Sequence, residues 1–221
     1  MKLPELPLTE PTEYGYLYLG MRIDSPRRVP FVRPSAERDA AIAACKDAAR
    51  RLEEIPEVID AEVYRATLIP PLKTSPRFDV MMLVKTVSPE AATRVRDFAP
   101  CRDLNADFVM AARNIRRIGD TDGTRDAHFL FNHFPGPDTE SAVKAWESFA
   151  SWYVVKMNVD NTTLLGPLET GPYAMVNQLR LPRGPVRYLL GQFRRPSFYS
   201  VVLKALRENG MGSLPVLCRP A

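Results

Sequence analysis

The alternation of apolar and polar residues marks one stretch of the chain as a buried strand. Residues 127–134 read Ala-His-Phe-Leu-Phe-Asn-His-Phe. Because neighbouring side chains of a strand point to opposite faces, Phe129 and His133 share one face and Asn132 lies on the other. Both faces are mostly apolar, which is typical of a strand covered on both sides. This strand therefore predicts a sheet with two covered faces.

Similar patterns before this strand predict six elements in the first half of the chain. Tyrosines alternate with leucines over 14–23, which indicates a strand, and apolar residues recur every three or four positions over 36–54, which indicates an amphipathic helix. Ser88-Pro89-Glu90 is a typical helix start, with a capping hydroxyl followed by proline. The expected elements are a strand at 14–23, a helix at 36–54, strands at 59–69 and 78–87, a short helix from Pro89, and a strand at 107–118.

The second half repeats this order. A polar turn over 119–124 separates the two halves, and Ser197 is the expected N-cap of the last helix, with Gly210 ending it. The expected elements are the strand at 127–134, a helix at 139–157, strands at 162–168 and 173–181, a helical turn opened by Pro185, a helix at 198–208, and a strand at 214–218.

Strand, helix, strand, strand, helix, strand is the order of a ferredoxin-like βαββαβ unit, and here it occurs twice. One such unit covers only one face of its sheet, so the doubly apolar strands predict an α+β fold in which two antiparallel sheets pack face to face. Short segments also correspond between the halves: 55–61 with 157–163, and 78–85 with 173–180. The chain thus resembles the dimeric α+β barrel superfamily in its tandem form.

This resemblance implies one compact barrel-like unit made by both repeats. The expected parts are an N-terminal arm at 1–12, a first repeat at 13–119 and a second repeat at 125–221. Since the second repeat takes the place of a partner subunit, the chain is expected to be a monomer or a homodimer.

Composition narrows the functional classes. A net charge of +4 with no block of like charges argues against a nucleic-acid partner. Three widely spaced cysteines disfavour a disulfide framework, and no apolar run reaches membrane-spanning length. The sequence predicts a cytoplasmic protein with no membrane partner. No nucleotide-binding, hydrolase or zinc-protease motif occurs, and no metal site is expected.

Polar side chains within apolar strands are the candidate site residues. A buried amide without a partner costs about 1–3 kcal/mol, so each amide is expected to pair across the sheet or to contact a ligand. Asn132 and His133 are the catalytic candidates, and a histidine in a cavity is suited to act as a base or to ligate haem. A core histidine bonded to backbone is the alternative. The ligand-binding candidates are Asn114, Asn177, Gln178, Arg180 and Arg187.

Arginines cluster between residues 180 and 195 without an intervening acid. Guanidinium groups match carboxylates bidentately, so Arg180 and Arg187 are candidates for binding a carboxylate or a haem propionate at a cavity mouth. The alternative is a solvated face.

The resemblance adds a possible chemistry. Cofactor-independent monooxygenases and haem-degrading members of the superfamily use a strand asparagine with a tryptophan and a histidine or arginine. Asn132 is similar in placement, and Trp146 and Trp152 lie on the following helix, although Trp146 belongs to the stripe expected to be structural core. Two hypotheses follow: binding of a small apolar or carboxylate-bearing molecule between the sheets, with haem or monooxygenase chemistry as variants, or a non-catalytic interaction module with a packed barrel. The sequence does not decide whether the chain is an enzyme.

Overall fold

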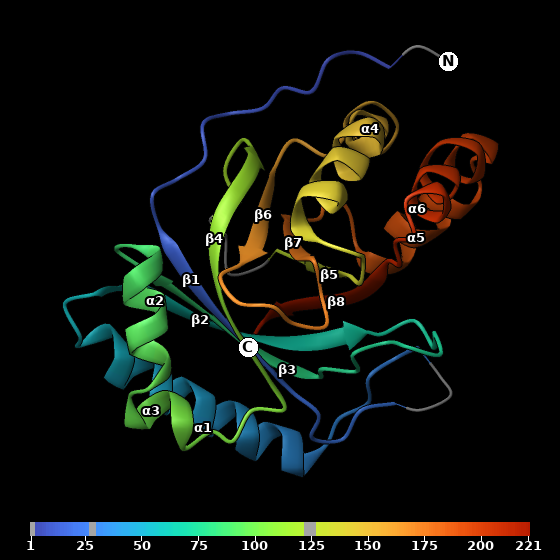
Figure 1. The fold of residues 1–221 in the computed structure, drawn as a ribbon. Helices are drawn as coiled ribbons and strands as arrows, with labels where there is room; N and C mark the ends of the chain where they lie inside the picture. The colour runs from blue at the N-terminus through green and yellow to red at the C-terminus, as the bar shows by residue number, and fades with distance from the viewer. Residues whose placement is uncertain (1–2, 27–29, 122–126) are drawn as a thin grey trace.

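The computed structural model describes residues 3–26, 30–121 and 127–221, in which eight antiparallel strands close into one barrel. The strands follow the order β1-β3-β2-β8-β5-β7-β6-β4, and β4 pairs with β1 to complete the ring. Two groups of helices cover opposite sides of the barrel (Figure 1). The predicted α+β fold with two ferredoxin-like repeats is confirmed.

The first repeat contains four strands and three helices. Ser35 caps the first helix by accepting a hydrogen bond from the Arg38 backbone N–H (3.4 Å), and Ser88 caps the second by accepting one from Ala91 (3.2 Å). Ser88 is thus the helix start that the sequence predicts. The elements are β1 (Gly15–Met21), α1 (Ala36–Glu53), β2 (Val58–Leu68), β3 (Val80–Thr86), α2 (Pro89–Arg96), α3 (Ala99–Arg102) and β4 (Phe108–Ile118).

The second repeat follows the same order. Asp138 caps its long helix by accepting a hydrogen bond from the Ser141 backbone N–H (2.8 Å). Gly210 follows the last helix with a φ of 62°, a conformation that glycine adopts without strain. The elements are β5 (Phe129–Phe134), α4 (Thr139–Met157), β6 (Thr162–Pro167), β7 (Met175–Arg180), α5 (Pro185–Phe193), the π-helix η1 (Phe198–Leu203), α6 (Lys204–Glu208) and β8 (Leu214–Pro220).

The last helical segment differs from its prediction. The helix expected over 198–208 is divided into η1 and α6. The prediction of Ser197 as its N-cap is wrong, because the Ser197 side chain makes no capping hydrogen bond. Its hydroxyl instead accepts a hydrogen bond from Trp152 Nε1 at 2.9 Å. This bond ties the start of η1 to α4.

The N-terminal residues that the structure describes lie against α4 of the second repeat and β4 of the first. Ser151 Oγ on α4 donates a hydrogen bond to the Pro4 carbonyl at 2.8 Å, and Thr9 forms an isolated bridge with Arg117. The predicted turn at 119–124 and the predicted start of the second repeat at 125 fall partly or wholly within 122–126, outside the described residues. None of the described helices combines the length and apolar character needed to cross a membrane.

Two seams join the repeats into one barrel. β2 pairs with β8, where Tyr64 lies opposite Pro220, and β4 pairs with β6, where Ile118 lies opposite Thr162. The two half-sheets are therefore hydrogen-bonded to each other as well as packed face to face. A closed sheet has no unpaired edge strand.

Aromatic side chains from both repeats meet inside the barrel. Tyr18 of β1 stacks on Phe131 of β5 with 5.2 Å between ring centroids, and Tyr64 of β2 meets Phe131 edge-on at 5.1 Å. Phe129 lies in the same interior cluster. The expected alternation along β1 and β5 is confirmed, since Leu17 and Leu19 of β1 and Leu130 and Phe134 of β5 face the helices instead.

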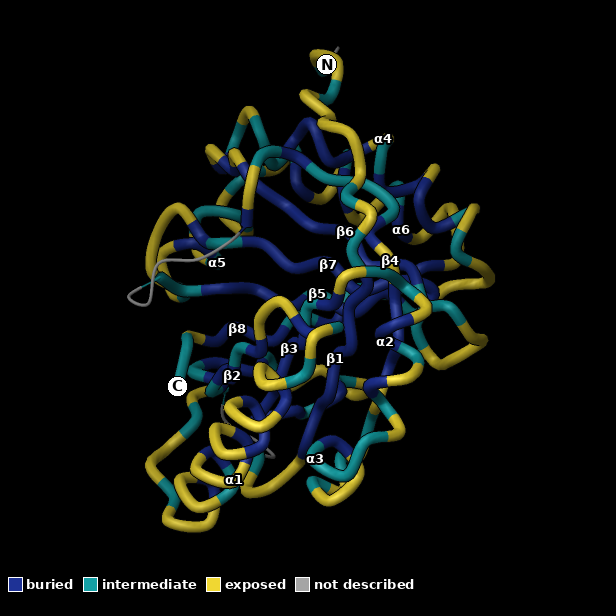
Figure 2. Tube along the Cα trace, turned by 90° about the vertical axis from the view of Figure 1, so that its left-hand side faces the viewer, coloured by how far each residue is buried: buried dark blue, intermediate teal, exposed yellow. Residues whose placement is uncertain are grey.

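The helices cover the two half-sheets differently. In the first repeat α1 lies along β2, and α2 lies against β1 and β4. In the second repeat α4 comes closest to the sheet at β7, while η1 and α6 lie against α4. Figure 2 shows the buried strands between helices whose outer faces are exposed. The second cover therefore stands further from its strands.

Candidate ligand-binding site

The two candidate catalytic residues lie on opposite faces of β5. His133 points into the barrel, where it meets Tyr18, whereas Asn132 points toward the helices of the second repeat. Asn177 lies directly opposite Asn132 on β7 and shares its face. Asn132 and Asn177 therefore do not share a cavity with His133, and the candidate site residues do not form one site. The cause is the two-residue period of a strand, which separates adjacent positions.

His133 is fully buried and both of its ring nitrogens have partners. Nδ1 lies 3.1 Å from the Leu214 carbonyl oxygen, and Nε2 lies 2.9 Å from Tyr18 Oη. A carbonyl only accepts, so Nδ1 carries the proton and Nε2 accepts from the tyrosine hydroxyl. Burial lowers the pKa of His133 to about 4, and the bond to Leu214 offsets only part of this effect. His133 is therefore neutral near pH 7 and has no free nitrogen.

Aromatic rings fill this end of the barrel around His133. The centroids of His133 and Tyr173 are 5.0 Å apart, and Phe78 stacks on Phe108 at 5.6 Å. Gly20 of β1 makes room for this cluster, because a Cβ atom there would lie 2.6 Å from the Phe78 ring. Aromatic side chains of the described residues thus occupy this end of the barrel.

The opposite end of the barrel is hollow. A recess of about 720 Å³ opens there, walled mainly by α1, β2 and β3 of the first repeat and reached by Gln178 of β7. Tyr64 donates a short hydrogen bond to Glu62 and accepts one from Gln178 Nε2 at 3.1 Å. Burial and the nearby Glu62 carboxylate raise the pKa of Tyr64. The interior of the barrel is thus open at this end, where the wall of the recess carries both Lys85 and Glu62.

Asn114 has structural partners near this recess. Its Nδ2 donates to the carbonyls of Arg116 (2.8 Å) and Leu164 (3.2 Å), and its Oδ1 accepts from the Thr12 backbone N–H (3.0 Å). These bonds satisfy its amide. They support the structural alternative for Asn114.

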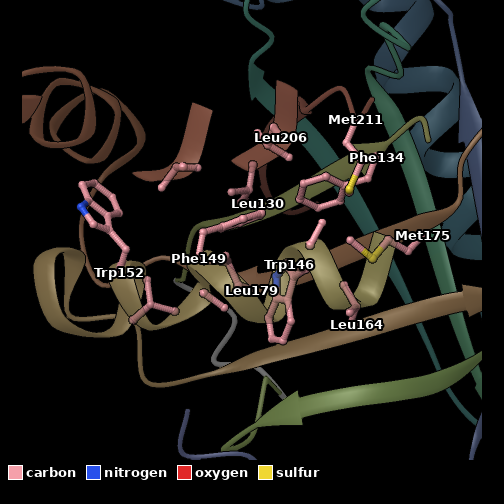
Figure 3. Close-up of a cluster of buried hydrophobic side chains, with 14 of the residues drawn as sticks. Leu130, Phe134, Trp146, Phe149, Trp152, Leu164, Met175, Leu179, Leu206 and Met211 are labelled. Carbon is pink, nitrogen blue, oxygen red and sulfur yellow. The ribbon is translucent and has the colours of Figure 1, made fainter. Parts of the chain in front are cut away.

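A second cavity lies between the outer face of β5–β8 and the helices of the second repeat. It has a volume of about 50 Å³ and is walled mainly by apolar side chains. Figure 3 shows Leu130 and Phe134 of β5 in the same core as Trp146 and Phe149 of α4, all four of which line the cavity. No charged side chain lines it among the described residues. We call this space the helix-side cavity.

Asn132 and Asn177 are the strand amides of the helix-side cavity. Asn132 and Ser213 exchange hydrogen bonds of 3.0 and 3.1 Å between their side chains. Thr162 Oγ1 donates a short hydrogen bond to Asn177 Oδ1. The protein therefore holds both amides in place at the floor of the cavity.

Tyr188 of α5 is the unusual group of the helix-side cavity. Its side chain lines the cavity and is only 1% exposed, yet its hydroxyl has no hydrogen-bond partner among the described residues. Burial, followed by the nearby Tyr153, raises the pKa of Tyr188, so the hydroxyl keeps its proton. An unpaired buried hydroxyl costs about 1–3 kcal/mol. The hydroxyl is therefore a donor without an acceptor.

Sequence reasoning missed Tyr188 as a site residue. Helical periodicity predicts that a tyrosine of this segment is buried, but it does not show whether the hydroxyl has a partner. That depends on the distance between α5 and the sheet, for which the sequence carries no pattern.

The two candidate arginines lie away from both spaces. Arg180 is half-buried at the end of β7, and its backbone N–H donates to Asn161 Oδ1 at 2.7 Å. Arg187 lies on the exposed face of α5. Neither lines the recess or the helix-side cavity. The expectation that they bind a carboxylate at a cavity mouth is not supported.

The residues of the helix-side cavity do not fit haem. Its lining includes no histidine, cysteine or methionine among the described residues, and burial raises the pKa of Tyr153 and Tyr188, which disfavours the tyrosinate that would ligate iron. A volume of about 50 Å³ is also far below that of known cofactor sites. His133 is on the other side of the strand with both nitrogens bonded. The described residues also contain no group of three or more His, Cys, Asp or Glu side chains suited to a metal ion.

Comparison with known proteins supports the fold. No family model matches the chain, and no curated protein matches its sequence. Among solved structures, an anthrone oxidase-like protein has a TM-score of 0.60 at 8% identity, with 94% of this chain and 93% of that chain covered. A chlorite dismutase from Candidatus Nitrospira defluvii has a TM-score of 0.55 at 12% identity, with 96% and 93% covered.

A third similar structure has a different role. It is described as a major regulator of staphylococcal pathogenesis and has a TM-score of 0.52 at 9% identity, with 94% of this chain and 99% of that chain covered. These similarities establish the dimeric α+β barrel fold in its tandem form. At such low identity they do not select a function, because the fold hosts several.

Proposed function

We propose that the chain binds a small, mostly apolar molecule in the helix-side cavity, and that the Tyr188 hydroxyl donates a hydrogen bond to one acceptor atom of that molecule. The observation that carries the proposal is a fully buried tyrosine hydroxyl without a partner in an apolar cavity. An acceptor on the ligand removes the cost of the unpaired donor.

The size of the cavity sets a condition for binding. About 50 Å³ holds only a few water-sized groups, so a ring compound enters when the helical cover moves outward. The cover is suited to this, since η1 and α6 lie against α4 rather than closely against the strands. We expect α5 to move with the ligand.

Tyr188→Phe tests the proposal. Acetophenone and α-methylstyrene have the same shape, but only acetophenone carries a carbonyl acceptor. We expect the folded protein to bind acetophenone about threefold to tenfold more tightly than α-methylstyrene, as one hydrogen bond allows. Tyr188→Phe removes this preference while leaving the unfolding free energy unchanged or raised, because the unpaired hydroxyl is gone. Calorimetric titration and urea unfolding measure the two effects.

Tyr199→Phe is the matched control, since Tyr199 is exposed on η1 and does not line the cavity. It should keep the preference for acetophenone. Equal binding of the two compounds by the unmodified protein, or a preference that survives Tyr188→Phe, contradicts the proposal.

Cofactor-independent oxygenation is a second candidate. It is favoured by one observation: Asn132 and Trp146 line the same cavity. The similarity to an anthrone oxidase-like protein makes anthrone the probe. In that reaction dioxygen converts the CH₂ of anthrone to a carbonyl, and the second oxygen atom leaves with both hydrogens as water. The cavity supplies no charged base among the described residues, so binding stays the first proposal. Oxygen uptake that depends on anthrone and on Asn132 would favour catalysis.

The cysteine side chains favour a cytoplasmic location. Cys45, Cys101 and Cys218 are free and buried. Unpaired thiols fit the reducing conditions of the cytoplasm, where we expect the chain to act as a monomer or homodimer.

A further inference from the structure

Helix α5 has two faces with different roles. Tyr188, Leu189 and Gln192 line the helix-side cavity, whereas Val186 and Leu190 lie on the other side and are exposed. In Figure 1, α5 and α6 form an outer edge of the molecule, away from the first repeat. The outer side of α5 is therefore available for contact.

An apolar strip runs along this outer side. Val186, Leu190 and Phe193 follow one another at helical spacing of four and three residues, and each is almost half exposed, at 45%, 47% and 48%. Tyr199 of η1 continues the strip, because its hydroxyl donates to the Phe193 carbonyl at 3.2 Å. Large apolar side chains gathered on one exposed face indicate a binding surface.

Positive charge surrounds the strip. Between Glu169 and Glu208 the chain contains seven Arg and Lys residues and no Asp or Glu. Arg183, Arg187 and Arg194 form a shallow groove of about 450 Å³ with Val186 and Leu190. These three arginines make no ion pair with any described residue. We call this surface, made by 183–199, the α5 face.

We propose that the α5 face docks on an anionic lipid membrane. Exposed apolar side chains within a field of Arg residues are the features of a helix that lies in a membrane interface. A second copy of the chain fits less well, because a symmetric contact would bring the same unpaired arginines together. This proposal departs from the expectation of no membrane partner, which was based on the lack of a membrane-spanning stretch. A helix that lies on the membrane surface does not need such a stretch.

This docking also indicates the source of the ligand, a point that rests on the proposed function. The same helix forms the wall of the helix-side cavity and carries the α5 face. Contact of its outer side with lipid would place the cavity next to the membrane phase, in which apolar molecules dissolve. The ligand class is then a membrane-soluble ring compound with one hydrogen-bond acceptor.

Co-sedimentation of the full chain with vesicles tests the docking. One set of vesicles contains phosphatidylcholine alone, and in the other a third of the lipid is phosphatidylglycerol. We expect binding to the second set only, decreasing at high salt. The single variants Arg187→Gln and Arg194→Gln should each lower the partitioning of the protein onto the anionic vesicles about fivefold. The double variant Leu190→Ser, Phe193→Ser also loses binding.

The controls carry the same changes elsewhere on the surface. Arg51→Gln with Arg102→Gln neutralises two exposed arginines of the first repeat, and Val109→Ser with Ile59→Ser changes two exposed apolar residues. Both double controls should bind as the unmodified chain does. Absence of binding to anionic vesicles, equal losses in the controls, or self-association that Leu190→Ser, Phe193→Ser abolishes without any vesicle binding overturns the proposal.

Tyr188→Phe separates this proposal from the proposed function. Its hydroxyl lies on the cavity side of α5, so the variant should bind vesicles normally even where it loses the preference for acetophenone. Each proposal can therefore fail alone.

Discussion

One buried histidine makes the folded state sensitive to acid. The pKa of His133 is about 4 in the folded protein, against 6.5 for an exposed histidine. Protonation therefore favours the unfolded chain, so this part of the stability is complete above pH 6.5 and is lost as the pH falls toward 4. The loss amounts to about 3 kcal/mol. Urea unfolding of the protein and of His133→Gln across this range should show the difference, and parallel pH profiles would contradict it.

Individual side chains were predicted unevenly from sequence. The alternation along β5 correctly placed Phe129, Phe131 and His133 on one face. Whether a polar atom finds a partner depends on distances between elements, which periodicity does not encode. For this reason the sequence pattern indicated Asn132, whose amide is hydrogen-bonded to Ser213. It did not indicate Tyr188, whose hydroxyl has no hydrogen-bond partner among the described residues.

At the scale of elements, Gly20 of β1 leaves the space inside the barrel that the Phe78 ring occupies. A methyl group at Gly20 would lie 2.6 Å from the Phe78 ring, which Tyr18 and Phe108 hold in place. Gly20→Ala should therefore lower the free energy of unfolding by about 1–3 kcal/mol. Gly171→Ala is the control, because no atom lies within 4 Å of its added Cβ, and it should be nearly neutral. Urea unfolding of both variants checks this, and a neutral Gly20→Ala would be inconsistent with the packing.

The elements themselves follow closely from sequence where local chemistry determines them. Ser88 and Pro89 start α2 as expected, and Gly210 follows the last helix as expected. Ser197 is not a cap because its own backbone is already helical, with φ −66° and ψ −20°, and its hydroxyl accepts a hydrogen bond from Trp152 of α4. The residue type predicts a helix start near this position but does not give the exact first residue.

For the whole molecule, the shared interior predicts that the two repeats unfold together. Phe131 of the second repeat contacts Tyr18 and Tyr64 of the first. Both tryptophans, Trp146 and Trp152, belong to the second repeat, so their fluorescence reports on that half, whereas circular dichroism reports on all helices. We expect the two signals to have the same urea midpoint. Phe131→Ala should lower the free energy of unfolding by about 3–5 kcal/mol, and the two signals should report the same decrease. Separate midpoints would show that the repeats are independent.

The joining of both repeats in one chain has a consequence for stoichiometry. A barrel assembled from two identical subunits must carry every side chain twice, in symmetric positions. Here Tyr188 occurs once, and the first repeat packs α1 and α2 directly against its strands. The first repeat can thus keep its structure while the helices of the second repeat move. Each barrel would then bind a single ligand molecule.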